Sequence, residues 1–151
     1  MAGRKVCKDC VTEFGEELAR KKARDAKFPG PRCKTHDLRV KRARRAARHG
    51  QHVERTFGIT HEQYWQLYHA QGGKCALCQR ATGVTKKLAV EHDHSCCPNP
   101  PTCGKCVRSL ACGPCNRFLG YGRDDPEFFE RFAEYLRNPP AKEVMKAWSV
   151  P

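Results

Sequence analysis

The sequence predicts a small α+β fold that zinc sites, more than an apolar core, stabilise. Charged residues make up 30% of the 151-residue chain and its mean hydropathy is −0.75, so the apolar surface available for burial is limited. The chain contains eleven cysteines, and several are spaced in pairs as zinc ligands are. Two short, half-apolar runs at residues 87–90 and 107–111 predict a β-hairpin between helical patterns. Small proteins with little core commonly depend on such metal sites.

Two Cys-x-x-Cys pairs bracket the centre of the chain. Cys75 and Cys78 form the first pair, and Cys112 and Cys115 form the second. Each pair can present two thiolates about 2.3 Å from one ion, so the two pairs together predict a closed, tetrahedral zinc site. Such a site would hold both ends of the intervening segment in one place.

An acid and imidazole cluster lies between the two pairs. It reads Glu-His-Asp-His at residues 91–94, and Asn116 comes directly after the last cysteine. Zinc binding is expected to make Glu91, His92 and Asn116 neighbours. A histidine exchanges protons near neutral pH, while carboxylate and amide oxygens suit Mg²⁺. His94 is given a supporting role, and the alternative for His92 is a buried structural histidine or zinc ligand.

Three motifs carry a resemblance to a known family. The sequences Y-x-x-Q-G-G-K-C-A-L-C-Q-R, V-E-H-D-H and C-G-P-C-N-R resemble recombination endonuclease VII, within the HNH or His-Me finger nucleases, over residues 58–137. The resemblance implies a ββα-metal core, in which a β-hairpin precedes a helix, and a phage-type protein. The family usually has aspartate where this chain has Glu91, a side chain one methylene longer.

The same resemblance implies the chemistry of the site. It makes His92 the general base, Glu91 and Asn116 the ligands of a catalytic Mg²⁺, and the four cysteines the structural zinc site. The implied reaction is phosphodiester hydrolysis on DNA, including branched or junction DNA, and leaves 5′-phosphate ends. Arg108, Arg117 and Lys105 are near enough in sequence to contact the scissile phosphate.

The N-terminal region predicts a second zinc site. Cys7, Cys10, Cys33 and His36 form two further pairs with ligand spacing. Residues 12–27 between them have apolar residues near helical spacing, with acidic residues early and basic residues late, and are expected to form a helix. Residues 28–31, with two prolines and a glycine, then form a turn.

Residues 37–55 predict a basic helix. The chain carries a net charge of +13, and residues 1–56 alone hold 17 basic and 7 acidic side chains. A cationic surface of this kind fits the phosphates of DNA. The alternative is a solvated linker helix. The candidate DNA-binding residues are Arg39, Lys41, Arg42, Arg44, Arg45 and Arg48.

Four more cysteines interrupt the predicted hairpin at residues 95–106. Cys96, Cys97, Cys103 and Cys106 can form a third zinc site, with His94 as an alternative ligand to Cys96. A disulfide is a further alternative. Adjacent cysteines are awkward ligands for one ion, so the sequence leaves these readings open.

Three regions follow from these patterns. Residues 1–56 are the N-terminal zinc module with its basic helix, residues 57–137 the nuclease-like core, and residues 138–151 a tail. Within the core, helices are expected after Thr60, from Asn116 to Gly120, and over residues 126–136, with a joint to the first module near residues 50–58.

The sequence also limits the possible binding partners and the cellular location of the protein. No apolar run approaches a membrane span and no signal peptide is evident, so a soluble, cytoplasmic protein is expected. The family resemblance implies that a phage encodes it and that it acts in a bacterial host. DNA is the expected partner, and a homodimer would suit cleavage of both strands. The competing hypothesis is a non-catalytic zinc module that binds nucleic acid.

Overall fold

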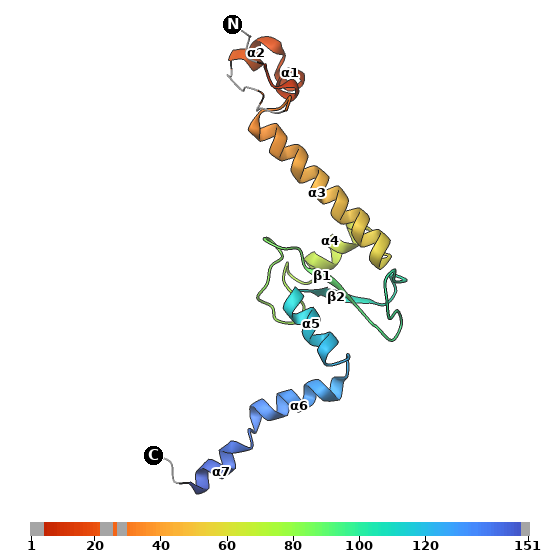
Figure 1. Cartoon of the computed structure of the whole chain (residues 1–151), viewed down its shortest axis with the longest axis vertical. Helices are drawn as coiled ribbons and strands as arrows, with labels where there is room; N and C mark the ends of the chain where they lie inside the picture. Colours follow the sequence, from red (N-terminus) through yellow and green to blue (C-terminus); the bar gives the residue numbers. More distant parts are fainter. Residues whose placement is uncertain (1–4, 22–25, 27–29, 149–151) are drawn as a thin grey trace. The chain divides into compact units, whose positions relative to one another are not determined.

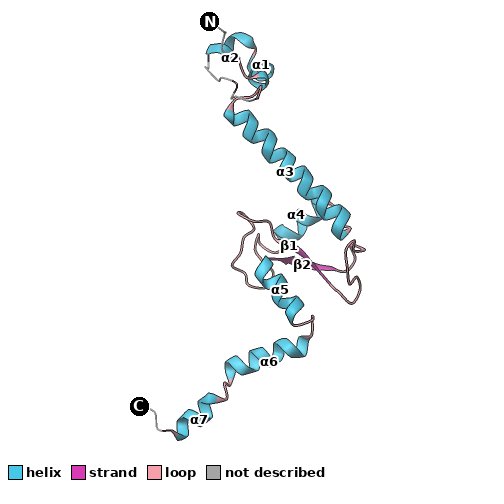
Figure 2. Cartoon of the chain, in the orientation of Figure 1, coloured by secondary structure: helices cyan, strands magenta, loops and turns pink. Residues whose placement is uncertain are grey.

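The computed structural model describes residues 5–21, 26 and 30–148. The chain divides into two compact units, Met1–His52 and Val53–Pro151. Helices dominate the described residues, and the one sheet among them has two strands (Figures 1 and 2). The prediction of a small α+β fold is therefore confirmed. Among these residues, no helix has both the length and the apolar character that crossing a membrane requires.

The first unit begins with two short helices, α1 (Lys8–Phe14) and α2 (Glu16–Lys21). The prediction of one helix over residues 12–27 is wrong, because Gly15 separates the two at a φ of 76°. This left-handed conformation is typical of a glycine that ends a helix. The end of the predicted helix and the first half of the expected turn at residues 28–31 lie outside the described residues.

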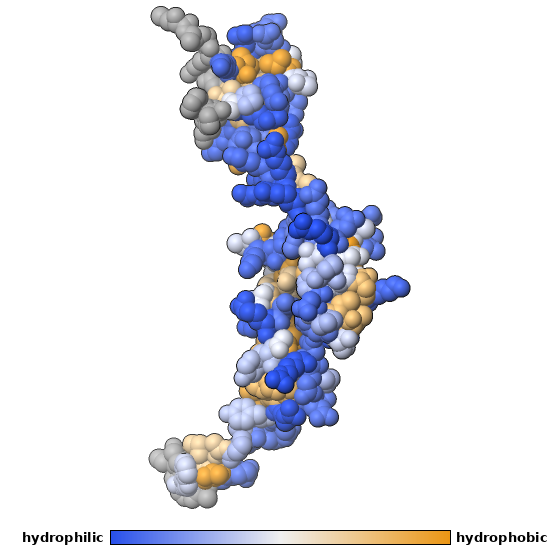
Figure 3. Space-filling model, turned by 45° about the vertical axis from the view of Figure 1, so that its right-hand side comes forward, coloured by the Kyte–Doolittle hydropathy of each residue, from blue (hydrophilic) through white to orange (hydrophobic). Residues whose placement is uncertain are grey.

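The basic helix, α3, is longer than predicted and runs over Lys34–Phe57. It continues through Gly50, so that glycine does not interrupt the helix at the expected joint. Nearly all of its side chains before Gly50 are exposed or half-buried. Most of the surface drawn in Figure 3 is correspondingly hydrophilic. This helix is therefore long and charged, and no apolar face packs along its whole extent.

Helix α4 (His61–Ala70) begins where the sequence predicts, at Thr60. The Thr60 hydroxyl accepts from the Gln63 backbone N–H at 3.1 Å, and the Gln63 side-chain oxygen accepts from the Thr60 N–H at 2.8 Å. This reciprocal pair satisfies two N–H groups that would otherwise lack partners at the start of the helix.

The sheet pairs β1 (Ala89–His92) with β2 (Val107–Ala111) in antiparallel fashion. The second strand is as predicted, but the first begins two residues later than the predicted 87–90, because its partner ends at Ala111, which pairs with Ala89. Glu91 pairs with Ser109 and His92 with Val107, so Arg108 is an extra residue in a β-bulge. Bulges often redirect a side chain toward a functional site.

The core of the second unit lies between this sheet and α4. Tyr64 is fully buried, and its hydroxyl donates to the Leu88 carbonyl at 2.9 Å. Trp65 and Tyr68 are partly buried and pack against the same core. The buried members are Val53, Ile59, Tyr64, Cys75, Leu88, Val90, Leu110 and Ala111.

Three helices follow the sheet: α5 (Gly113–Tyr121), α6 (Pro126–Arg137) and α7 (Ala141–Ala147). Helix α5 starts three residues before the predicted Asn116, because Pro114 favours the first turn of a helix. Asp125 caps α6 by accepting from the Glu127 N–H at 2.9 Å, which agrees with the predicted start. Helix α7 lies in the segment expected to be an unclassified tail.

The segment between the strands docks onto the end of α3. The Thr102 N–H donates to the Thr56 carbonyl at 2.9 Å, and the Thr102 hydroxyl donates to the Phe57 carbonyl at 3.0 Å. The backbones of Gly58 and Gly104 meet so closely that a Cβ on Gly58 would lie 2.7 Å from the Thr102 carbonyl oxygen. Gly58 also has a φ of 67°, which other residues rarely adopt.

This contact yields a stability prediction. Gly58→Ala should lower the free energy of unfolding by about 1–3 kcal/mol from its left-handed backbone alone, with a further loss from the clash. Gly120→Ala is the matched control, because Gly120 lies within α5 with no neighbouring atom within 4 Å of the added Cβ. That variant should be neutral or up to about 1 kcal/mol more stable. Urea unfolding measures both, and equal effects would contradict the docking described here.

Candidate active site and metal centres

The core cysteine group consists of Cys75, Cys78, Cys112 and Cys115, and the structure brings all four together. Their sulfur atoms lie within 4.8 Å of one another. The Cys78 and Cys112 sulfurs are 3.9 Å apart. Thiolates bound about 2.3 Å from one tetrahedral zinc ion would be about 3.8 Å apart, so this geometry fits the ion.

Backbone amides stabilise the charged form of two of these thiols, Cys75 and Cys78. The N–H groups of Ala81 and Arg80 lower the pKa of Cys78 to about 6. The Cys112 N–H donates to the Cys75 sulfur at 3.2 Å. Zinc binds the thiolate and not the thiol, so the lowered pKa values of Cys75 and Cys78 favour its binding. Burial and the neighbouring thiols raise the pKa of Cys115 to about 12, and a bound cation would offset this effect.

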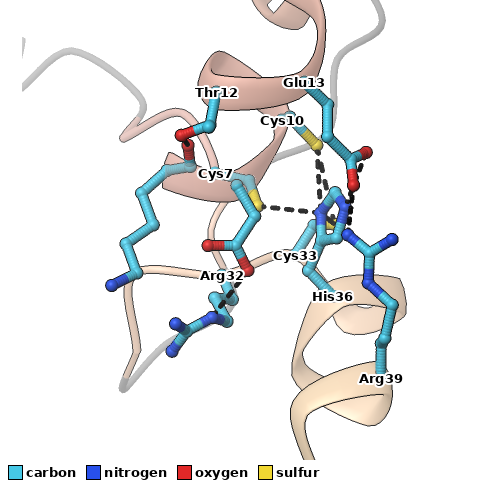
Figure 4. A network of polar contacts seen from close by, with 10 residues as sticks. Cys7, Cys10, Thr12, Glu13, Arg32, Cys33, His36 and Arg39 are labelled. Atoms are coloured by element: carbon cyan, nitrogen blue, oxygen red, sulfur yellow. Dashed lines mark hydrogen bonds and ion pairs between the residues drawn. The ribbon is translucent and has the colours of Figure 1, made fainter.

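The N-terminal cysteine group consists of Cys7, Cys10, Cys33 and His36 (Figure 4). All four residues are buried. The His36 Nδ1 lies 3.3 Å from the sulfurs of Cys7 and Cys33 and 3.4 Å from that of Cys10. A tetrahedral zinc ion would place such nitrogen and sulfur ligands about 3.5 Å apart, so Nδ1 is the ligand atom of this group.

Figure 4 also shows what orients His36. Its Nε2 lies 3.0 Å from a carboxylate oxygen of Glu13, which must accept, so Nε2 carries the hydrogen and Nδ1 is free for a metal. Glu13 in turn pairs with Arg39, which lowers the pKa of Glu13. A carboxylate behind a histidine is the usual support of a zinc ligand.

The insert cysteine group consists of Cys96, Cys97, Cys103 and Cys106, within the insert at residues 95–106. Its sulfur atoms also lie within 4.8 Å of one another. Cys96 is 3.9 Å from Cys97 and 3.8 Å from Cys103 between sulfurs, far beyond the about 2.05 Å of a disulfide. All eleven cysteines of the chain are free, so the disulfide alternative is not what the structure shows.

The carboxylate of Glu91 is buried and paired. Glu91 is 3% exposed, and the Arg108 guanidinium donates to both of its oxygens, with Nε at 3.0 Å from Oε2. Hydrogen bonding to Glu91 raises the pKa of Arg108 further above its usual range. Arg108 was expected to contact a scissile phosphate, whereas the bulge directs it to the acid beside the candidate base.

Asp124 is a site residue that the sequence did not reveal. Its carboxylate accepts from Arg108 at 3.0 Å and lies 2.9 Å from Nδ1 of His94. Burial raises the pKa of Asp124, but His94 and Arg108 outweigh burial and lower it. Asp125, and not Asp124, caps the helix that follows. No motif or spacing in the sequence indicates a role for Asp124 in the site, which is evident only from its contacts with Arg108 and His94 in the structure.

The candidate base His92 is held on several sides. It is 7% exposed, and its ring centroid lies 4.6 Å from that of His94 and 5.9 Å from that of Phe57. Its Nε2 lies 3.1 Å from the Cys97 carbonyl oxygen. A carbonyl can only accept, so Nε2 carries the hydrogen and Nδ1 of the neutral ring keeps its lone pair. No cysteine group includes His92 or His94.

Asn116 lies in the first turn of α5, directly after the core cysteine group. Its backbone N–H donates to the Cys112 carbonyl at 2.9 Å, and the residue is half-buried. Helix α5 lies against β1, the strand that carries Glu91 and His92. Within the described part of the chain, the Asn116 amide makes no hydrogen bond, either to Glu91 or to His92.

The six candidate DNA-binding residues all lie on α3, in the first unit. Arg39 is paired with Glu13, and Lys41 with Asp37 at 2.8 Å. The remaining four have no acidic partner among the residues that the structure describes: Arg42, Arg44, Arg45 and Arg48. Their exposed guanidinium groups therefore form the unneutralised part of the helix.

Comparisons with known proteins show which family the chain belongs to. The family described as "Recombination endonuclease VII" matches residues 50–138, which include the core cysteine group, the acid and imidazole cluster, and the insert. No solved structure matches the chain. The "Gene 59 protein" of Mycobacterium phage L5 is 47% identical over 143 residues, which cover 94% of this chain and 79% of that protein. The protein of the same name from Mycobacterium phage D29 is 46% identical over the same shares. The chain therefore belongs to the recombination endonuclease VII family, whose members are nucleases.

Proposed function

We propose that this protein is an HNH-type DNA endonuclease that hydrolyses phosphodiester bonds, with β1, β2 and α5 as its ββα-metal core. The observation that carries the proposal is His92, a buried imidazole with a defined tautomer, beside the buried carboxylate of Glu91 on one strand. Branched DNA is the proposed substrate, since the family is described by its role in recombination. A homodimer stays a prediction.

His92 is the proposed general base. Its Nε2–H donates to the Cys97 carbonyl, so Nδ1 is the nitrogen that can take a proton from an attacking water. The neighbouring rings of His94 and Phe57 restrict rotation of the imidazole. A base held in one orientation loses little entropy when it meets its substrate, and such positioning lowers the barrier.

Glu91 and Asn116 have the donor chemistry for Mg²⁺. A carboxylate offers about four lone-pair positions, and Arg108 uses two of those on Glu91, so others remain for a cation. The amide of Asn116 is a second hard oxygen donor. When bound, Mg²⁺ supplies charge stabilisation for the leaving oxygen. Arg108 offsets the buried charge of Glu91, and Asp124 holds both Arg108 and His94 in place.

The core and N-terminal cysteine groups are the proposed structural zinc sites. Both have the sulfur or nitrogen spacing of a tetrahedral ion, and their soft thiolates contrast with the hard oxygens of Glu91 and Asn116. Helix α3 is the proposed DNA-binding arm. Its four unpaired arginines add affinity without sequence selection, because phosphate contacts release counterions from any sequence.

The first of three predictions about this function concerns the base. His92→Ala should reduce nicking of a four-way junction by at least about 100-fold while binding changes little, because a positioned base supplies that much rate. His69→Ala is the control, since His69 is an exposed histidine on α4. Duplex and single-stranded DNA, tested alongside with Mg²⁺, define the preferred substrate. Binding without nicking by the unaltered protein would favour the non-catalytic zinc module instead.

The second prediction concerns the arm. Replacing Arg42, Arg44, Arg45 and Arg48 with glutamine should weaken DNA binding and reduce the slope of log affinity against log salt by about 3–4, the loss expected for four phosphate contacts. The control removes four cations that already have acidic partners: Arg20, Lys21, Arg131 and Lys146. If both variants change the slope equally, the effect is one of net charge and the arm has no special role.

The third prediction separates the two kinds of metal. Dialysis into metal-free buffer should stop nicking without unfolding, and added Mg²⁺ should restore it, because few protein ligands hold that ion. Cys112→Ser should instead yield molten or insoluble protein, since a structural zinc site of this kind contributes on the order of 10 kcal/mol to folding. Near-ultraviolet circular dichroism and zinc content distinguish the cases. A folded but inactive Cys112→Ser protein would argue against the core zinc site.

A further inference from the structure

The insert cysteine group is not used by the function proposed above, yet it lies next to the candidate base. We propose that Cys96, Cys97, Cys103 and Cys106 bind a third zinc ion, and that this ion positions His92 through the backbone of Cys97. The positioning part rests on the proposed function, whereas the metal site does not. His92 is the group that acts, and Cys97 is a positioning residue.

The sulfur atoms of the insert already have the spacing of zinc ligands. The separations of 3.9 Å for Cys96 and Cys97 and 3.8 Å for Cys96 and Cys103 match the about 3.8 Å edge of a tetrahedral zinc–thiolate site. Adjacent cysteines therefore present their sulfurs to one point, which the sequence alone made doubtful. His94, the alternative fourth ligand, is engaged with Asp124 instead.

Apart from the docking of Thr102 and Gly104 onto the end of α3, the insert has little to hold its shape. Of residues 95–106, only Thr102 and Cys106 are buried, and Cys96 and Cys103 are exposed. A segment with so few apolar contacts cannot offset the entropy of ordering its backbone. Four thiolates on one ion supply the missing restraint in the way that small zinc modules do.

Two backbone hydrogen bonds connect this group to the end of β1. The Asp93 N–H donates to the Cys106 carbonyl at 2.9 Å, and the Cys97 N–H donates to the Asp93 carbonyl at 3.1 Å. Asp93 is itself fixed, because its carboxylate accepts from the Ser95 N–H at 2.8 Å. The backbone between His92 and Cys97 is thus restrained by hydrogen bonds at both of its ends.

Cys97 joins the metal group to the base within one residue. Its sulfur belongs to the insert cysteine group, and its carbonyl accepts from Nε2 of His92 at 3.1 Å. A ligand sulfur held by zinc restricts the Cys97 backbone, and the restricted carbonyl restricts the ring. Losing the ion should leave His92 in the core hairpin but allow its ring to move, which affects turnover more than binding.

The test uses the full-length protein with Cys96→Ser and Cys103→Ser combined. Zinc per chain should fall from three to two by elemental analysis. The Nε2–H proton of His92, visible by NMR while it is bonded to a carbonyl, should exchange with water and disappear. On junction DNA, kcat should fall by about 100-fold, the effect of a misplacement near 1 Å, while KM stays within about twofold. Asn99→Ala, an exposed insert residue, is the control and should change none of these.

A second measurement covers the case in which the double variant does not fold. The unaltered protein is exchanged with ¹¹³Cd²⁺, and three cadmium resonances are expected, one of them coupled to the β-protons of Cys97. Two resonances, or two zinc ions per chain in the unaltered protein, would overturn the third site. A double variant with two zinc ions that keeps the His92 signal and kcat would overturn the positioning role. If the unaltered protein does not nick DNA, the proposed function fails, while the zinc count and the His92 signal still test this inference.

Discussion

The rest of the structure depends on one constraint: the ligand atoms of the three cysteine groups each come together around one position. In the first unit, the buried apolar cluster has four described members, and three of them are the cysteines Cys7, Cys10 and Cys33. The second unit has a larger cluster, but Cys75 belongs to it as well. Apolar burial of this size offsets little of the entropy lost on folding. The three cysteine groups could each hold a metal ion, and we propose that metal ligation supplies much of the remaining stability.

The same constraint explains how a short hairpin can carry a site. The core cysteine group ties the segment before β1 to the start of α5, and the insert cysteine group closes the turn between the strands. Glu91 and His92 lie between these two points on one strand. The buried charge of Glu91 is then balanced by Arg108, and Arg108 by Asp124, so the polar cluster is paired throughout. Buried charges that lack such partners are strongly unfavourable.

The sequence predicted those features that depend on a few neighbouring residues. The ligand pairs, the Thr60 and Asp125 caps and the second strand all follow from spacing or from one residue type. The sequence did not reveal the contacts of Arg108 and Asp124, because they depend on a β-bulge and on a residue some thirty positions from His94. The sequence pattern also predicted one helix across Gly15, because the spacing of apolar residues does not indicate the positive φ of this glycine. The roles of His92, Glu91 and Asn116 remain predictions.

A zinc titration of the reduced, metal-free chain tests most directly whether metal ligation holds this protein together. Near-ultraviolet circular dichroism reports the packing of Tyr64 and Trp65 in the core of the second unit. Without zinc, the chain should show no such signal and no cooperative thermal transition. Both should appear as zinc is added and stop changing at three equivalents per chain. A metal-free, reduced chain with the full signal and an unchanged thermal transition would contradict the account.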